Sequence, residues 1–237
     1  MKGRAGAPSG VEKIAPPRGK RRDLLELAVA YGLILIVIWT PRPWQRVLWW
    51  VAAAAVVAFT AVSFDGLNAM GLRRANFFRS LWVAGAALLV ALTAVAAAAW
   101  LHTLRLPASA LLFIETYWAY ALWALVQQFL LQCFFLLRIR RIVTGELAAA
   151  LTAAGIFALA HLPNPILAPV TFLWGVGACL LFLRYRNLYP LGIAHAILGI
   201  SIAIAIPGKV DHNMRVGYSY LTYGHRAHPP PHPSTQP

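Results

Sequence analysis

The sequence predicts an all-α protein, a polytopic bundle of transmembrane helices with about seven spans. Of its 237 residues, 60% are hydrophobic and 12% are charged, whereas a soluble globular domain carries about 25% charged residues. The hydrophobic residues gather in long runs, and a helix needs about 17–25 apolar residues to cross a hydrocarbon core of about 30 Å. Six to eight spans fit these runs, and we expect seven, at residues 24–40, 44–63, 80–101, 109–137, 147–161, 166–183 and 188–207.

Individual residues between and within these runs account for the boundaries, packing and length of the segments. The apolar density falls at Pro41–Pro43, between the first and second segments. Alanine dominates the second and third segments, which allows neighbouring helices to approach closely. The fourth segment exceeds the length of one span, so we expect it to tilt or to project from the membrane. The fifth ends near His161 because Pro163 lacks an N–H and interrupts the helix. Arg184 and Arg186 separate the sixth segment from the seventh.

The charge distribution predicts the orientation and excludes a nucleic-acid role. The net charge is +14, and 15 of the 21 Lys and Arg residues lie before the first segment or in alternate loops. Loops of this kind face the cytoplasm, so we expect a cytoplasmic N-terminus and contacts with anionic lipid headgroups. The alanine- and arginine-rich composition favours a bacterial inner membrane.

The chain divides into one membrane domain with two tails. Residues 1–23 are basic and rich in proline and glycine, and we expect them to be disordered and to precede an uncleaved signal anchor. Residues 24–207 form the membrane domain. Residues 208–237 form a C-terminal segment whose end is rich in proline and histidine, a composition that favours a solvated tail over a weak metal site. Within it, residues 211–220 have a more specific composition than a linker needs, and the sequence offers no account of them.

Polar side chains lie deep inside three of the predicted segments. Gln127 and Gln128 are adjacent in the fourth segment, with Gln132 one turn later, and His161 and His195 lie in the fifth and seventh. Counted along the helices, they fall about 10–21 Å from the inner membrane edge. Polar groups at such a depth face a bundle interior or a functional cavity. We expect one shared cavity, although glutamines can also serve as hydrogen bonds between helices.

This layout resembles the CAAX-protease and bacteriocin-processing family of intramembrane proteases, also called the Abi family. The family pattern is Glu-Glu-x-x-x-Arg, then Phe-x-x-x-His, then His-x-x-x-Asn on a later helix. Phe157–His161 fits the second motif and His195 fits the first position of the third, within a motif core at residues 118–204. The resemblance implies an endopeptidase in which a glutamate and the first histidine activate water, while the second histidine and the asparagine stabilise an oxyanion.

The sequence departs from that pattern at four positions. An amide oxygen accepts hydrogen bonds but is too weak a base to take a proton from water. General-base assistance contributes about 10²–10⁴-fold to a rate, and one oxyanion donor contributes about 10²–10³-fold. The replacements therefore predict a weakened or absent activity. They are Gln127 and Gln128 for the two glutamates, Gln132 for the arginine and Gly199 for the asparagine.

Three groups could replace the missing carboxylates. Glu115 is the one acidic residue well inside a predicted segment, about 18 Å along the helix axis from Gln127. Neutral His161 could itself act as the base. His161 and His195 could hold a metal with a glutamine oxygen, but zinc sites rarely use amide ligands. We therefore expect no metal and no cofactor.

Three functions remain open from the sequence. The first is an intramembrane endopeptidase acting on a membrane-associated peptide or protein, with His161 as base, His195 as oxyanion donor and Gln127 or Gln128 orienting water. The second is a catalytically inactive pseudoprotease that binds membrane segments or partner proteins. The third is a small transporter or channel, against which the absence of repeats and of paired intramembrane charges counts.

Overall fold

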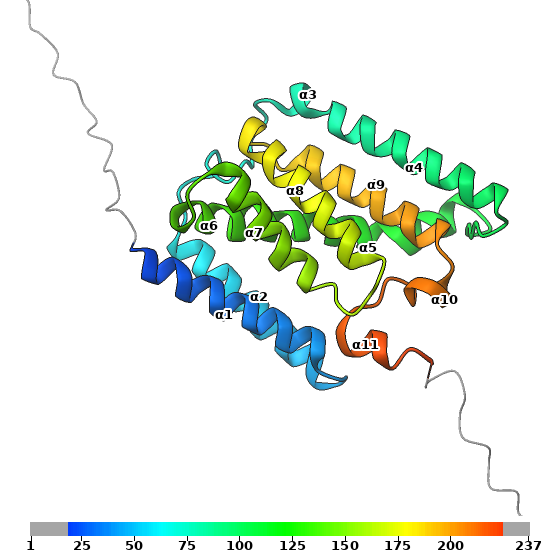
Figure 1. The fold of residues 1–237 in the computed structure, drawn as a ribbon, viewed down its shortest axis with the longest axis horizontal. Coiled ribbons are helices and arrows are strands. Elements are labelled where there is room, and N and C mark those ends of the chain that lie inside the picture. The colour runs from blue at the N-terminus through cyan, green and yellow to red at the C-terminus, as the bar shows by residue number, and fades with distance from the viewer. Residues whose placement is uncertain (1–18, 225–237) are drawn as a thin grey trace, which may run out of the picture.

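The computed structural model describes residues 19–224 and confirms the all-α class, since this part of the chain holds helices and no strand (Figure 1). One helix continues without a break from α5 through a π-helix, η1, into α6. The elements are α1 (Lys20–Trp39), α2 (Trp44–Val62), α3 (Phe77–Ser80), α4 (Trp82–Trp100), α5 (Ala110–Gln128), η1 (Phe129–Leu136), α6 (Leu137–Ile142), α7 (Glu146–Leu159), α8 (Leu167–Tyr185), α9 (Tyr189–Ala205), α10 (Gly208–Asp211) and α11 (Gly217–Leu221).

Each of the predicted apolar segments contains one long helix whose ends lie within a few residues of the expected ones. Within residues 19–224, four helices are long and apolar enough to cross a membrane: Trp44–Val62, Phe77–Trp100, Ala110–Ile142 and Leu167–Tyr185. The apolar helices α7 and α9 are shorter. The structure thus supports a helical membrane protein, while the count of seven spans and the cytoplasmic N-terminus stay predictions.

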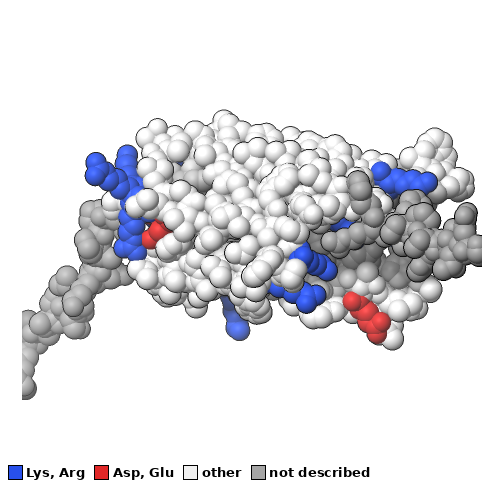
Figure 2. Space-filling model, turned by 90° about the horizontal axis from the view of Figure 1, so that it is seen from below, with Lys and Arg blue, Asp and Glu red and all other residues white. Residues whose placement is uncertain are grey.

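The outer surface of the bundle is broadly apolar. Large hydrophobic side chains are well exposed along several helices, among them Leu89 at 67%, Trp100 at 81% and Leu173 at 71%. Figure 2 shows a face that is mostly uncharged, with Lys and Arg in a few separate groups and Asp and Glu at two places. Soluble monomers rarely expose apolar patches of more than a few hundred Å², so this surface fits contact with lipid.

The helices pack in pairs around α9, and small residues mark the closest approaches. Helix α9 lies against α4 and α5, α7 lies against α8, and α1 and α2 form a hairpin at the side of the bundle (Figure 1). A Cβ on Gly175 of α8 would lie 3.0 Å from the Cβ of Ala154 in α7, and a Cβ on Gly192 would lie 2.6 Å from Leu125. Glycine at these positions therefore allows α8 and α9 to contact their neighbours closely.

A buried charge network joins α1, α2 and α6. Glu26 is 5% exposed and accepts hydrogen bonds from Arg138, Arg22 and Ser63 at 2.9, 2.8 and 3.1 Å. One turn earlier, Asp23 accepts two bonds from Arg141, at 2.7 and 2.8 Å. Two charges removed from water are stable only when paired and hydrogen-bonded, so this network fixes the start of α1 against α6.

The N-terminal tail ends earlier in the structure than the sequence predicted. The disordered tail was expected to reach residue 23, but α1 begins at Lys20, because Asp23 is held in the bundle by Arg141. The remainder of that predicted tail, residues 1–18, lies outside the described residues. So does the Pro/His-rich end, residues 225–237.

Replacing the buried carboxylate tests this network. Glu26→Gln leaves Arg138 buried without a counter-charge, which should lower the free energy of unfolding by about 3–5 kcal/mol. The matched control is Glu146→Gln, which breaks the exposed pair of Glu146 (64% exposed) and Arg140 and should cost less than about 1 kcal/mol. SDS titration of the detergent-solubilised protein measures both, and equal losses would contradict the assignment.

Candidate functional site

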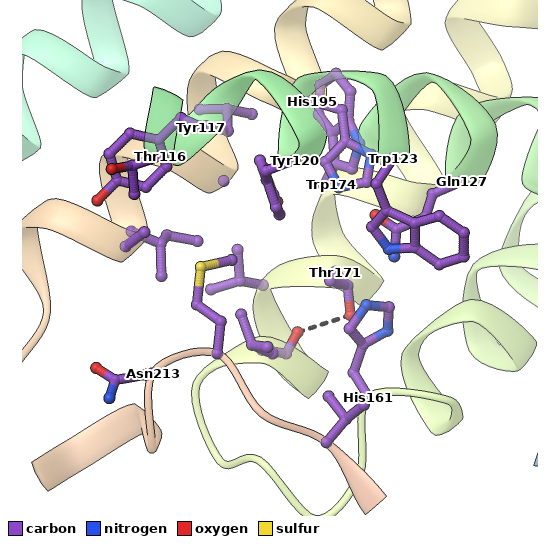
Figure 3. A pocket seen from close by; sticks show the side chains of 18 of the residues that line it. Thr116, Tyr117, Tyr120, Trp123, Gln127, His161, Thr171, Trp174, His195 and Asn213 are labelled. Atoms are coloured by element: carbon purple, nitrogen blue, oxygen red, sulfur yellow. Dashed lines mark hydrogen bonds between the residues drawn. The ribbon is translucent and has the colours of Figure 1, made fainter. Parts of the chain in front are cut away.

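A cavity of about 580 Å³ opens between α5, α8 and α9 (Figure 3). Its walls are largely apolar and aromatic, with a few polar groups. The end of α7, the loop before α5 and the C-terminal segment complete it. The lining residues are Thr116, Tyr117, Tyr120, Trp123 and Gln127 from α5, Leu167, Val170, Thr171 and Trp174 from α8, Leu198, Gly199, Ile202, Ala203 and His195 from α9, and Arg105, His161, Asn213, Met214 and Val216.

The structure brings the four predicted site residues together, in two kinds of position. Gln127, His161 and His195 line the cavity. Gln128 is fully buried behind His195. Gln127 thus faces the shared cavity, as expected for a site residue. Gln128 instead forms a hydrogen bond between helices, which was the other role expected for the glutamines.

A chain of amides determines the protonation of His195. Gln132 Nε2 donates to Gln128 Oε1 at 3.2 Å, and Gln128 Nε2 lies 2.9 Å from His195 Nδ1. An amide NH₂ can only donate, so Nδ1 of His195 accepts, and the proton of the neutral ring is on Nε2. The spacing of Gln128 and Gln132 by one turn allows this chain. His195 therefore offers an N–H donor.

The end of α7 gives His161 the opposite tautomer. The backbone N–H of His161 bonds to Ala158 O at 2.9 Å, so the carbonyl of Phe157 loses its usual helical partner. His161 Nδ1 lies 2.7 Å from that carbonyl. A carbonyl can only accept, so Nδ1 carries the proton and Nε2 has a free lone pair. The ring of Phe157 contacts both imidazoles edge-on, with centroids 4.7 Å from His161 and 6.0 Å from His195.

Tyr120 is a cavity residue that the sequence analysis missed. A Cβ placed on Gly199 would lie 1.7 Å from the Tyr120 hydroxyl oxygen, so the phenol occupies the space of a side chain at position 199. Tyr120 lies seven residues before Gln127, which places both on one face of α5. That helical spacing was the signal in the sequence that could have identified it.

The C-terminal segment at residues 211–220 closes one side of the cavity. Asn164 is fully buried and donates from Nδ2 to the carbonyls of Asp211 and Arg215, at 2.7 and 3.0 Å. Asn213, Met214 and the preceding His212 all have positive φ, between 51° and 57°, and this turn points Met214 toward the cavity. The segment that the sequence left unexplained thus forms a wall of the cavity, which is anchored by Asn164 and by the hydrogen bond from Gly217 N–H to the carbonyl of Leu162.

Glu115, one of the groups that could replace the missing glutamates, does not reach the cavity. Glu115 is exposed and does not line the cavity, which overturns its proposed role, because it faces away on the outer side of α5. No carboxylate among the described residues lines this cavity. Within residues 19–224, no group of three or more His, Cys, Asp and Glu side chains is placed to hold a metal ion.

The comparisons with known proteins agree with the resemblance drawn from the motifs. Residues 109–200 match the family model Rce1-like, described as type II CAAX prenyl endopeptidase Rce1-like. The matched stretch runs from the start of α5 into α9 and contains Gln127, His161 and His195. No curated protein and no solved structure matches the chain.

The wall at residues 211–220 contains an acidic group with an abnormal environment. The side chain of Asp211 is fully buried, and its Oδ1 accepts from the N–H of Asn213 at 2.9 Å. Its Oδ2 has no partner among the described residues. Burial raises the pKa of Asp211 above its usual value, although the Asn213 N–H and the charge of Arg105 act in the opposite direction.

This pKa shift predicts a pH dependence of stability. Because the folded state holds the proton of Asp211 more tightly than the unfolded state, its contribution is favourable at low pH and is lost as the pH rises through the raised pKa. The apparent melting temperature should therefore fall less between pH 4 and 8 in Asp211→Asn than in the wild type. An unchanged slope in Asp211→Asn would contradict the assignment.

Proposed function

We propose that the chain is an intramembrane endopeptidase that hydrolyses a peptide bond of a membrane-associated peptide or protein, with His161 as its general base. One observation carries this proposal: His161 Nδ1 lies against the carbonyl of Phe157 and His195 Nδ1 lies against the amide nitrogen of Gln128, on one cavity. These partners favour opposite tautomers, with a lone pair on His161 Nε2 and an N–H on His195 Nε2. The family match over residues 109–200 supports the reaction class.

The two imidazoles have complementary roles in hydrolysis. His161 Nε2 takes a proton from water as the water oxygen attacks the scissile carbonyl carbon. His195 Nε2–H donates to the carbonyl oxygen as it gains negative charge. When the tetrahedral intermediate collapses, the C–N bond breaks and the His161 imidazolium returns the proton to the leaving amine. Gln127 orients the water by hydrogen bonding, and Gln128 holds His195 in the required tautomer.

The cavity walls favour an apolar substrate segment. Trp123, Trp174, Leu198 and Ile202 supply aromatic and aliphatic surface. The guanidinium of Arg105 donates from Nη2 to the carbonyls of Ala203 and Ile206 at the end of α9, so its charge is already engaged by the protein. We expect prenylated, signal-like or sorting-tail peptides in the bilayer to be the substrate class.

The proposed setting is a bacterial inner membrane with the N-terminus of the chain in the cytoplasm. The start of α1, α6 and the α8–α9 turn lie at one end of the bundle (Figure 1). These elements carry Lys20 to Arg22, Arg140 and Arg141, and Arg184 and Arg186. Such a basic end would face the cytoplasm and contact anionic headgroups.

A pseudoprotease is the second candidate, and a specific observation favours it. The cavity presents the amide of Gln127 where the family pattern has a glutamate, and no described carboxylate lines the cavity. An amide cannot take the proton. If His161 alone does not suffice as a base, the cavity binds membrane segments or partner proteins without cleaving them.

Removing the proposed base is the first test. The purified protein in nanodiscs should cleave a member of a panel of prenylated, signal-like and sorting-tail peptides, detected by mass spectrometry. His161→Ala should reduce the rate about 10²–10⁴-fold, the usual contribution of general-base catalysis. The control is His102→Asn, which changes a histidine outside the cavity at φ 55° to a residue that tolerates that φ. Equal turnover by wild type and His161→Ala would exclude the proposed mechanism.

Introducing a carboxylate distinguishes the two candidates. In Gln127→Glu, a carboxylate faces the cavity and can share the proton with His161, so the cleavage rate should rise about tenfold or more over the wild type. An inert wild type with an active Gln127→Glu variant would instead identify a pseudoprotease with an otherwise intact cavity.

A further inference from the structure

The hydroxyl of Tyr120 is a polar group that the proposed mechanism does not use. Tyr120 projects from α5 into the cavity on the same side as His195, with His161 across the cavity from both (Figure 3). Tyr120 is half-buried, and its hydroxyl has no hydrogen-bond partner among residues 19–224. A Tyr hydroxyl in a largely apolar setting usually finds an acceptor, so this one is available to a ligand in the cavity.

The position of this hydroxyl relative to His195 follows from α9. The hydroxyl oxygen lies 1.7 Å from where a Cβ of Gly199 would be, so it marks the start of a side chain at position 199. His195 and Gly199 are one turn apart on the same face of α9, and Cβ atoms with that spacing are about 5–6 Å apart. The phenol O–H and the imidazole therefore flank the same stretch of the cavity.

Both groups can donate to one ligand oxygen. The amide chain from Gln132 leaves the proton of His195 on Nε2, and the phenol O–H of Tyr120 has no competing acceptor. No described carboxylate lines the cavity to repel an anion. Two uncommitted donors in an apolar cavity are suited to an oxygen that carries negative charge.

We propose that Tyr120 and His195 form an oxyanion subsite, which takes the negatively charged oxygen of a tetrahedral acyl intermediate or of a group with that shape. The proposal rests on the proposed function for the place of the subsite in the reaction, but the binding of an oxyanion is a separate property. The proposed subsite also explains why position 199 is a glycine. Any side chain there would meet the Oη, Cζ and Cε1 atoms of Tyr120, at 1.7, 2.4 and 2.7 Å from its Cβ, and would displace the ring.

The test compares two membrane peptides of the same apolar sequence, one with a phosphinate in place of the scissile amide and one with the natural amide. The phosphinate is tetrahedral and anionic, so it should bind the wild-type protein in nanodiscs about 10- to 100-fold more tightly, the range expected for a hydrogen bond to a charged group. Isothermal titration calorimetry measures both dissociation constants.

Three variants test whether the Tyr120 hydroxyl causes the preference for the phosphinate peptide. Tyr120→Phe should lose most of it, and so should Gly199→Ala, whose methyl group displaces the ring. The control is Tyr31→Phe, which removes a buried hydroxyl that has no partner among the described residues and lies on α1 against Phe135, outside the cavity lining. It should keep the wild-type preference. An equal preference in Tyr120→Phe and wild type, or no preference in the wild type, would overturn the proposal.

Peptide cleavage separates this inference from the proposed function. If the wild type cleaves the amide peptide, Tyr120→Phe should lower kcat about 10²–10³-fold, as expected for one oxyanion donor, with a smaller change in KM. If the wild type does not cleave but prefers the phosphinate in a Tyr120-dependent manner, the subsite is supported and the catalytic proposal fails. Cleavage with the same kcat in Tyr120→Phe would overturn the subsite and leave the peptidase in place.

Discussion

The hydrogen bond between His161 Nδ1 and the carbonyl of Phe157 is the interaction on which the rest of the site depends. It exists because α7 ends at this point: the backbone N–H of His161 bonds to Ala158, and the carbonyl of Phe157 needs another donor in an apolar environment. Satisfying that carbonyl with a side chain fixes the proton of His161 on one ring nitrogen and leaves the other free. Pro163, two residues later, helps to stop the helix there. A structural requirement of a helix end thus produces a group that can accept a proton.

The need to satisfy buried hydrogen-bonding groups also fixes the tautomer of His195, here through two glutamine side chains. Gln128 and Gln132 are buried amides, and their hydrogen bonds lead to His195 Nδ1. Two glutamines in place of acidic and basic residues keep this part of the bundle neutral, which avoids the large desolvation penalty of buried charges. The loss of the glutamates therefore changes the chemistry of the cavity without removing its organisation. The remaining base is an imidazole, and the remaining donors are an imidazole and, as we propose, a phenol.

Hydrophobicity predicted the helices well because each apolar segment is long and is bounded by proline, glycine or arginine. It could not predict that α1 begins at Lys20, since that depends on Asp23 meeting Arg141 from a distant part of the chain. The meeting of Gln127, His161 and His195 was predictable from their similar depth. Tyr120 was missed because its role depends on the absence of a side chain at Gly199, on another helix. The wall built by residues 211–220 was missed because it depends on Asn164, whose side chain bonds to two carbonyls far along the sequence.

The central claim is that the two histidines hold opposite tautomers in the resting protein. It can be tested directly by ¹⁵N NMR of protein labelled at histidine side chains, with the signals assigned by His161→Ala and His195→Ala. We expect that His161 carries its proton on Nδ1 and that His195 carries its proton on Nε2. Finding both rings in the same tautomer, or finding a proton on Nε2 of His161, would contradict it.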